Sequence, residues 1–254
     1  NRAYMQKLPL CFQVLDETVR VETEPLAAQV RLDELLPALR VLDDAVTGIA
    51  VRKDGHPVTC AKGCSMCCRI QLVPVTPAEA YALLWMTESM PEERRAEIRA
   101  RFEDRVARLE QAGLAEFFRE TDSLSTAPGM REQMPRYLEL GLACPFLEGD
   151  VCGIYESRPF ACREFLVTTP KEECATPLSG SVRTVPKIFF MGLAAVEAGA
   201  SLGARGRMVP LILALEYAEE HRAELEREYP SGQVLAESIR QVFVMGYRQG
   251  SLTI

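Results

Sequence analysis

The sequence predicts a mainly α-helical protein: a helical domain with a loop-rich cysteine cluster and little or no sheet. Three observations support this prediction. Apolar residues recur at steps of three and four over long stretches, as they do on one face of a helix. No regular alternation of long strands with helices and no internal repeat is visible. Cysteines are concentrated in two short, turn-rich stretches, which predicts a compact site carried by loops.

The length and composition predict a single domain over residues 1–254. With 254 residues and 48% apolar composition, the chain can bury one large core or two modest ones without covalent cross-links. We divide it into an N-terminal helical segment (1–56), a cysteine-cluster core (57–175) with a helical insert (77–140), and C-terminal helices (176–254).

The N-terminal segment carries a helical pattern from Leu26 to Ile49, whose apolar residues recur at steps of three and four. Pro25 is well placed for the start of this helix, because proline is tolerated in the first turn. Pro37 lies within the pattern and predicts a kink or a break. The turn at Gly55 then ends the helix and leads to the first cysteines.

The insert begins with a helix-start signal at Thr76-Pro77, followed by Glu79 three residues after the threonine, as in a capping box. A second helix is predicted from Pro91 to Glu120. Half of its residues are charged and only a narrow apolar stripe is present, so its charges are expected to mark a solvated face.

The part of the chain around the second cysteine group predicts turns. Residues 123–135 are rich in turn-forming residues and predict a loop, and Gly149-Asp150 predicts a tight hairpin that brings Cys144 close to Cys152. Further helices are predicted over 185–200, 209–228 and 234–249.

Eight of the nine cysteines predict a metal site, because thiolates select zinc, copper(I) or iron-sulfur clusters. A disulfide framework is the alternative, but the size of the chain and the adjacent Cys67-Cys68 pair argue against it. Cys11 is remote from both groups and is expected to be a buried apolar filler. The predicted ligands are Cys60, Cys64, Cys67 and Cys68 in the first group and Cys144, Cys152, Cys162 and Cys174 in the second.

Composition excludes other classes of function. The formal net charge of −7 provides no basic surface for phosphate backbones, so nucleic-acid binding is not expected. No apolar run reaches the roughly 18–20 residues of a membrane span. No signal peptide is visible, which favours a cytoplasmic location. With two histidines and no nucleophilic triad, phosphate loop or dinucleotide fingerprint, ordinary acid–base catalysis has little support.

The order of the cysteines and the residues between them indicate a family. Cys60-x3-Cys64-x2-Cys67-Cys68 is followed by Cys144-Pro-Phe-Leu, Cys152-x-Ile-Tyr-Glu-x-Arg-Pro-x-x-Cys162-Arg and Cys174. Over residues 57–175 this pattern resembles the YkgJ-like cysteine-cluster family, which is described as zinc- or iron-chelating. The resemblance implies a metal or iron-sulfur site on the eight cysteines, and a related cluster occurs in enzymes that methylate flagellin lysines. The helical insert and flanks depart from the family pattern.

The first three cysteines also match the spacing found in radical S-adenosylmethionine enzymes. That class is built on a partial α/β barrel, whereas the residues after Cys68 predict one short apolar stretch and then helices. This reading is therefore disfavoured.

Three residues beside the cysteines are predicted to support the bound metal or cluster without ligating it. Arg158 and Arg163 flank Cys162, and such cations could compensate the negative charge of bound thiolates. Tyr155 is expected to pack nearby with its hydroxyl hydrogen-bonded. Because adjacent residues rarely direct both side chains to one centre, Cys67 and Cys68 favour a two-centre or polynuclear site.

Three functions remain open at this point. The first is an iron-sulfur protein in electron transfer or redox sensing, with an unknown protein or redox partner. The second is a zinc protein whose metal is structural and whose helices form a partner-binding surface. The third is a cluster-dependent enzyme resembling the protein lysine methylases. Colour separates the first two, because zinc is d10 and colourless whereas iron-sulfur clusters are brown.

Overall fold

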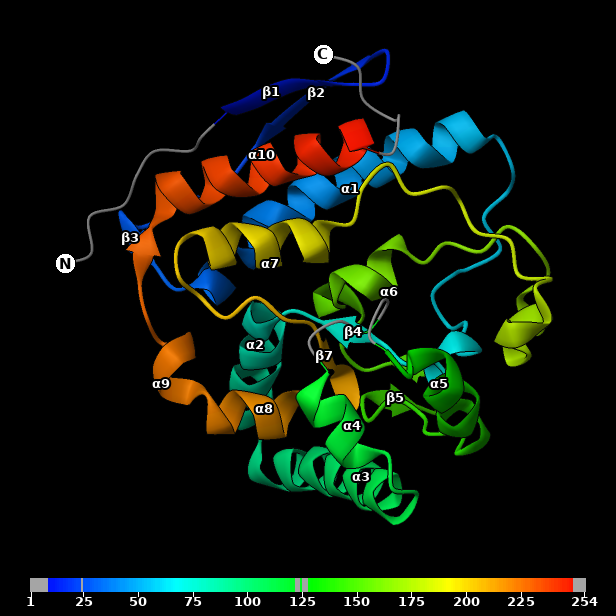
Figure 1. Ribbon diagram of the computed structural model, residues 1–254. Helices are drawn as coiled ribbons and strands as arrows, with labels where there is room; N and C mark the ends of the chain where they lie inside the picture. Colours follow the sequence, from blue (N-terminus) through cyan, green and yellow to red (C-terminus); the bar gives the residue numbers. More distant parts are fainter. Residues whose placement is uncertain (1–8, 24, 122–123, 125–127, 249–254) are drawn as a thin grey trace.

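The computed structural model describes residues 9–23, 25–121, 124 and 128–248. The described chain is mainly helical, which confirms the predicted class (Figure 1). Its strands form four short antiparallel pairs, so the protein is not strictly all-α. The first eight and last six residues of the predicted terminal segments lie outside the described residues.

The N-terminal segment is not helical throughout. Strands β1 (Pro9–Val14) and β2 (Glu17–Glu22) form an antiparallel hairpin, which contradicts the prediction of helix for residues 1–56. The apolar residues of this stretch alternate with polar ones, which is the pattern of a half-buried strand. Val14 and Val19 are buried in the core that the hairpin shares with α1 (Leu36–Asp54).

Helix α1 begins later than predicted, at Leu36 after the 3-10 turn Leu32–Leu35. Pro37 lies in the first turn of α1, where the missing N–H removes no helical hydrogen bond, so the predicted kink was wrong. The helix ends at Gly55, whose φ of 72° is left-handed and favours glycine.

The predicted capping box at the start of α2 (Pro77–Glu88) is confirmed, but the next helix is shorter than predicted. Helix α3 (Glu92–Gln111) ends before Gly113, whose φ is 67°, and α4 (Ala115–Glu120) is a separate helix. Helix α5 spans Met130–Glu139, so the prediction of a loop over 123–135 was wrong for residues 130–135. Residues 122–123 and 125–127 lie outside the described part.

The C-terminal part is helical, as predicted, with boundaries that differ. Strand β7 (Val209–Pro210) pairs with β4 (Pro74–Val75), and β8 (Tyr229–Pro230) pairs with β3 (Gln29–Val30). The predicted helix 209–228 therefore begins only after β7, and it is divided into the 3-10 turn Leu211–Leu213 and two short helices. The helices of this part are α7 (Met191–Ser201), α8 (Ala214–Glu220), α9 (Arg222–Leu225) and α10 (Ser231–Arg248).

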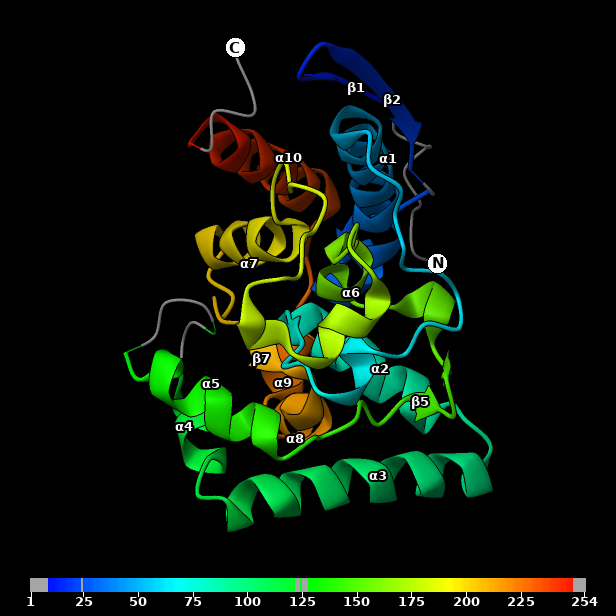
Figure 2. The ribbon, with the colours of Figure 1, turned by 90° about the vertical axis from the view of Figure 1, so that its right-hand side faces the viewer.

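Two hydrophobic cores organise these elements. The first is formed by α1, α7, α10 and the β1–β2 hairpin, and the second by α2 to α5 with α8. Figures 1 and 2 show the first group at one end of the molecule and α3 along the opposite edge. Helix α6 (Phe160–Glu164) contributes Phe160 to the first core, whereas Cys144 and Cys152 pack against the second. The cysteine loops therefore join the two cores.

Candidate metal centre

The two cysteine groups meet at one cavity. The cavity has a volume of about 340 Å³ and lies where the loops after Cys60 and after Cys144 face α6. No disulfide is present among the described residues, which agrees with the rejected disulfide framework. The cysteines that line the cavity are Cys60, Cys64, Cys67, Cys68, Cys144, Cys152 and Cys162.

Backbone and side-chain hydrogen bonds lock the first cysteine loop onto the second. The Cys144 N–H donates to the carbonyl oxygen of Cys68 at 2.7 Å, which joins residues 76 positions apart in the chain. On the other side, Arg69 and Ser65 donate to the Asp150 carboxylate at 2.7 and 2.5 Å. Asp150 lies in the hairpin between β5 (Leu147–Glu148) and β6 (Val151–Cys152), which confirms the predicted turn.

Cys60 is anchored separately to the segment after α6. The Val167 N–H donates to the Cys60 sulfur at 3.2 Å, and the Thr59 N–H donates to the Val167 carbonyl at 2.8 Å. An N–H donor on sulfur stabilises the thiolate over the thiol and tunes a metal bound to it. Cys60 thus already has one of the interactions that a ligated thiolate requires.

Two buried carboxylates fix the helix that carries Cys162. Glu79 accepts hydrogen bonds from the N–H groups of Thr76 (2.8 Å) and Phe160 (2.7 Å), so it binds the starts of both α2 and α6. Glu164, at the end of α6, accepts from the N–H of Met191 at 2.7 Å at the start of α7. Burial raises the pKa of Glu79. Helix α6 is therefore positioned by hydrogen bonds at both ends.

A third buried carboxylate, Asp43 on α1, predicts a pH dependence. Burial, followed by the nearby Glu164 carboxylate, raises the pKa of Asp43 to about 8. In the unfolded chain this pKa is about 3.9, so the folded protein binds more protons between these values and its stability falls as pH rises through them. We expect Asp43→Asn to flatten the fall in melting temperature between pH 6 and pH 9. Glu92→Gln, which changes an exposed carboxylate that does not act on Asp43, should leave the slope unchanged. A parental slope in Asp43→Asn would contradict the prediction.

The thiols of the adjacent residues Cys67 and Cys68 have pKa values shifted in opposite directions. The hydrogen bond from the Cys67 thiol, assisted by the positive charges of Arg158 and Arg69, lowers the pKa of Cys68 to about 7 against the opposing effect of burial. The same hydrogen bond and burial raise the pKa of Cys67. Burial also raises the pKa of Cys144 to about 12. Cys68 is thus the best prepared of these three to bind a metal as thiolate.

The thiols that influence the pKa of a given cysteine do not all belong to the same group of cysteines in the sequence. After burial, the groups that raise the pKa of Cys174 are Cys60 and Cys64, so Cys174 lies beside the first sequence group although it does not line the cavity. Burial of its sulfur, followed by the thiols of Cys144, Cys68 and Cys152, raises the pKa of the half-buried Cys162. Cys68 is the thiol with the most neighbours, because its charge raises the pKa of Cys60, Cys67, Cys144, Cys152 and Cys162. Cys64 acts on the pKa of Cys60 and Cys174.

The predicted arginines have different surroundings. Arg158 lines the cavity, its guanidinium lies 3.8 Å from the centre of the Tyr155 ring, and its Nε donates to the Tyr155 carbonyl. Its charge lowers the pKa of Cys68 after the hydrogen bond from Cys67 and against burial. Arg163 instead pairs with Asp44 on α1 and is not among the residues lining the cavity. Sequence reasoning missed Lys187, which also lines the cavity and comes from a segment without cysteines.

The donor set fits a soft metal, although the sulfurs are not closed around one point. Within the described ranges, no three His, Cys, Asp or Glu side chains stand in an arrangement that would hold a metal ion as it is. Seven thiols on short loops around one cavity nevertheless supply the donors that zinc or iron-sulfur clusters require, and binding would bring them together. Cys11 is exposed on β1, so the prediction of a buried filler was wrong.

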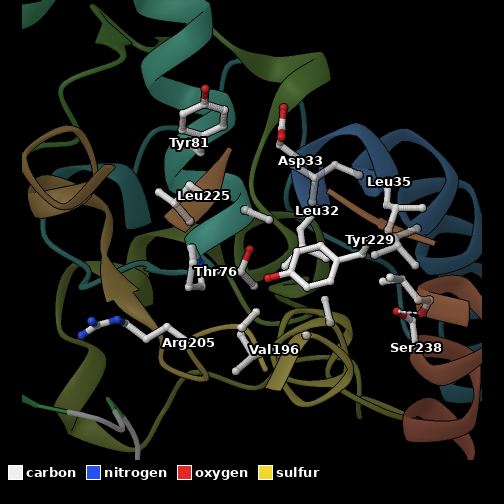
Figure 3. A pocket seen from close by; sticks show the side chains of 18 of the residues that line it. Leu32, Asp33, Leu35, Thr76, Tyr81, Val196, Arg205, Leu225, Tyr229 and Ser238 are labelled. Carbon is white, nitrogen blue, oxygen red and sulfur yellow. Dashed lines mark hydrogen bonds between the residues drawn. The ribbon is translucent and has the colours of Figure 1, made fainter. Parts of the chain in front are cut away.

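A second hollow, between α1, α2, α7 and α10, is too small for a ligand. Figure 3 shows Tyr229 among its lining side chains, and the buried Tyr229 hydroxyl has no hydrogen-bond partner among the described residues. Its volume of about 40 Å³ would hold roughly three waters at ~10–15 Å³ each. Ligand sites usually measure ~300–1,000 Å³. Only the cysteine cavity, of these two, reaches that range.

Comparison with known families agrees with this geometry. Residues 59–178 match the family model CxxCxxCC, described as a putative zinc- or iron-chelating domain. Over somewhat less than half of its length, the chain is therefore similar to the CxxCxxCC family. The predicted resemblance over 57–175 is thereby confirmed, and the match supports metal binding as the general activity of the segment. The matched segment contains all eight predicted ligands and also α2 to α5, so the helical insert lies inside the matched range.

No curated protein and no solved structure matches the chain. No helix in the described part of the molecule is long and apolar enough to span a lipid bilayer.

Proposed function

We propose that the matched segment of this protein holds an iron-sulfur cluster, or two, and serves in electron transfer or redox sensing. The observation that carries the proposal is the convergence of seven cysteines on one cavity of about 340 Å³. An eighth, Cys174, lies beside Cys60 and Cys64.

The volume of the cavity favours a cluster over one zinc ion. Four thiolates around zinc lie at ~2.3 Å from the metal and leave no empty space at the centre. At the same ~10–15 Å³ per water, the cavity has room for roughly 23–34 waters, and more cysteines line it than one tetrahedral ion can use. Iron together with inorganic sulfide would occupy such a space and would engage more of the thiols.

The charges around the cavity are suited to an anionic centre. Cluster-bound thiolates are negative, and buried negative charge requires cations or hydrogen-bond donors. Arg158 and Lys187 line the cavity, and the Val167 N–H donates to Cys60. When bound, an iron-sulfur cluster would supply reversible one-electron chemistry, and hydrogen bonds and positive charge near its sulfurs would raise its reduction potential.

Metal and sulfide content test the proposal directly. We expect the full chain, purified without oxygen, to contain iron and acid-labile sulfide in comparable amounts and to absorb broadly in the visible range. Bleaching by dithionite and recovery on reoxidation would demonstrate redox activity. Zinc without sulfide, in colourless protein, would contradict the proposal and would favour a structural metal module whose helices bind a partner.

A further inference from the structure

Helix α3 carries a stripe of arginines that faces the chain around Cys144. At 3.6 residues per turn, Arg94, Arg101, Arg105 and Arg108 fall within an arc of about 60° on the helix surface. Figure 2 shows the chain between α5 and β5 running along this helix. The composition of α3 predicts that its charged residues only face solvent. Four of its arginines instead face another segment of the chain.

The central two arginines bind the backbone on both sides of Cys144. The Nε of Arg105 donates to the Ala143 carbonyl at 3.1 Å. The Nη1 of Arg101 donates to the carbonyls of Pro145 and Leu147 at 3.2 and 3.3 Å. The side chain of Arg101 is 25% exposed and that of Arg105 is 21% exposed. Water therefore competes less for their N–H donors than it would at an open surface.

The outer arginines extend the same contact. Arg108 donates to the Leu140 carbonyl, and Arg94 pairs with the Glu148 carboxylate on β5. Glu97 pairs with both Arg94 and Arg101, which holds these two side chains on the same face of α3. Together the four arginines contact the chain from residue 140 to residue 148.

The opposite side of this segment faces the cysteines. The Cys144 N–H donates to the Cys68 carbonyl at 2.7 Å, and the Cys144 side chain lines the cavity. Phe146 packs edge-on against Phe102 of α3 with ring centres 5.3 Å apart. The backbone at Cys144 is thus held between α3 on one side and the first cysteine loop on the other.

We infer that Arg101 and Arg105 are positioning residues for the metal centre, which they serve by fixing the peptide groups around Cys144 so that its thiol faces the cavity. This inference rests on the proposed metal-binding function. The arginines touch no thiol in this role. They satisfy the carbonyl oxygens of Ala143, Pro145 and Leu147. Between Leu140 and β5, the backbone bonds to other parts of the described chain are those of the Cys144 N–H with Cys68 and of the Phe146 carbonyl with Gly153.

The test compares the double variant Arg101→Gln/Arg105→Gln with Arg99→Gln in the full chain. Arg99 lies on the other flank of α3, where it pairs with Glu219 and Glu88 away from Cys144. Metal-free protein is treated with iodoacetamide, and alkylation of Cys144 and Cys60 is followed by peptide mass spectrometry. We expect the double variant to increase the Cys144 rate about tenfold, since three charge-assisted hydrogen bonds that oppose local opening are lost.

The Cys60 rate distinguishes positioning from general loosening of the fold. A selective increase at Cys144, absent in Arg99→Gln, supports the inference. No change at Cys144, or an equal increase at Cys60, overturns it. If the double variant does not fold, Arg105→Lys retains the charge and loses the fixed geometry of the guanidinium, and it should produce a smaller increase at the same cysteine.

A second measurement separates this inference from the proposed function. Metal-free protein is titrated with Zn²⁺ in competition with a chromophoric chelator, because zinc binds thiolate sites whichever metal is native. We expect weaker Zn²⁺ binding in the double variant and parental affinity in Arg99→Gln. If the parent binds no Zn²⁺ and no iron, the proposed metal function fails, while the alkylation rates still decide whether the arginines position Cys144. Parental Zn²⁺ affinity in the double variant overturns the inference.

Discussion

Cys68→Ser should remove most of the bound metal and lower the melting temperature, whereas Cys64→Ser should retain a larger part of both. Cys68 lies among Cys67, Cys144, Cys152 and Cys162, and its pKa is lowered to about 7 by the hydrogen bond from Cys67 and the nearby arginines. Cys64 instead has Cys60 and Cys174 as its neighbouring thiols. A thiolate-built centre contributes its binding free energy to folding, so the loss of one central ligand is expected to cost several kcal/mol.

Metal analysis and thermal denaturation of the two variants measure this difference. Cys11→Ser is the matched control, because Cys11 is exposed on β1 and distant in sequence from both groups. It should retain parental metal content. Equal and complete loss in Cys68→Ser and Cys64→Ser would contradict the expected difference and would indicate that both thiols are essential to one cooperative centre. Unchanged metal in Cys68→Ser would remove that residue from the ligands.

Glu79→Ala should be among the most destabilising single substitutions outside the cysteines. The Glu79 side chain is 2% exposed and accepts from the N–H groups of Thr76 and Phe160. Alanine would leave two buried donors unsatisfied and would remove the negative charge facing Arg40. From the usual cost of such losses we expect about 3–5 kcal/mol less unfolding free energy, measured by urea denaturation.

Two further variants test the cause of the Glu79 effect. Glu79→Gln keeps one acceptor in place and should cost less than alanine, because the Phe160 N–H can still be satisfied. Glu92→Ala removes an exposed carboxylate from the first turn of α3 and should change stability by no more than ~0.5 kcal/mol. A Glu79→Ala variant as stable as Glu92→Ala would show that the buried hydrogen bonds at α6 contribute little.

Local signals in the sequence predicted several elements well. The Thr76-Pro77-Glu79 signal identified the start of α2, and Gly149-Asp150 identified the hairpin between β5 and β6. Both features depend on residues three or fewer positions apart, whose conformational preferences are local. The convergence of both cysteine groups could also be predicted, because thiols without a shared partner have little reason to cluster in a sequence of this size.

The errors arose where distant segments decide the structure. β3 and β8 pair residues about 200 positions apart, and no local pattern indicates such a partner. The neighbours of Cys174 could not be read from the order of the cysteines, because Cys174 returns to Cys60 and Cys64 of the first sequence group. The role of the α3 arginines was hidden for the same reason: the carbonyls they bind belong to residues 140–147.

The connection between β3 and β8 also determines when the protein can mature during its synthesis. The last cysteine, Cys174, leaves the ribosome about 55 residues before Tyr229, which pairs with Val30 in the first core. At ~5–20 residues per second, this interval lasts roughly 3–11 s. Helix α8, which packs into the second core, also follows Cys174. During this time all eight thiols are synthesised but neither core is complete, so the nascent chain passes through a period in which its cysteines are open to oxidation and to premature metal capture.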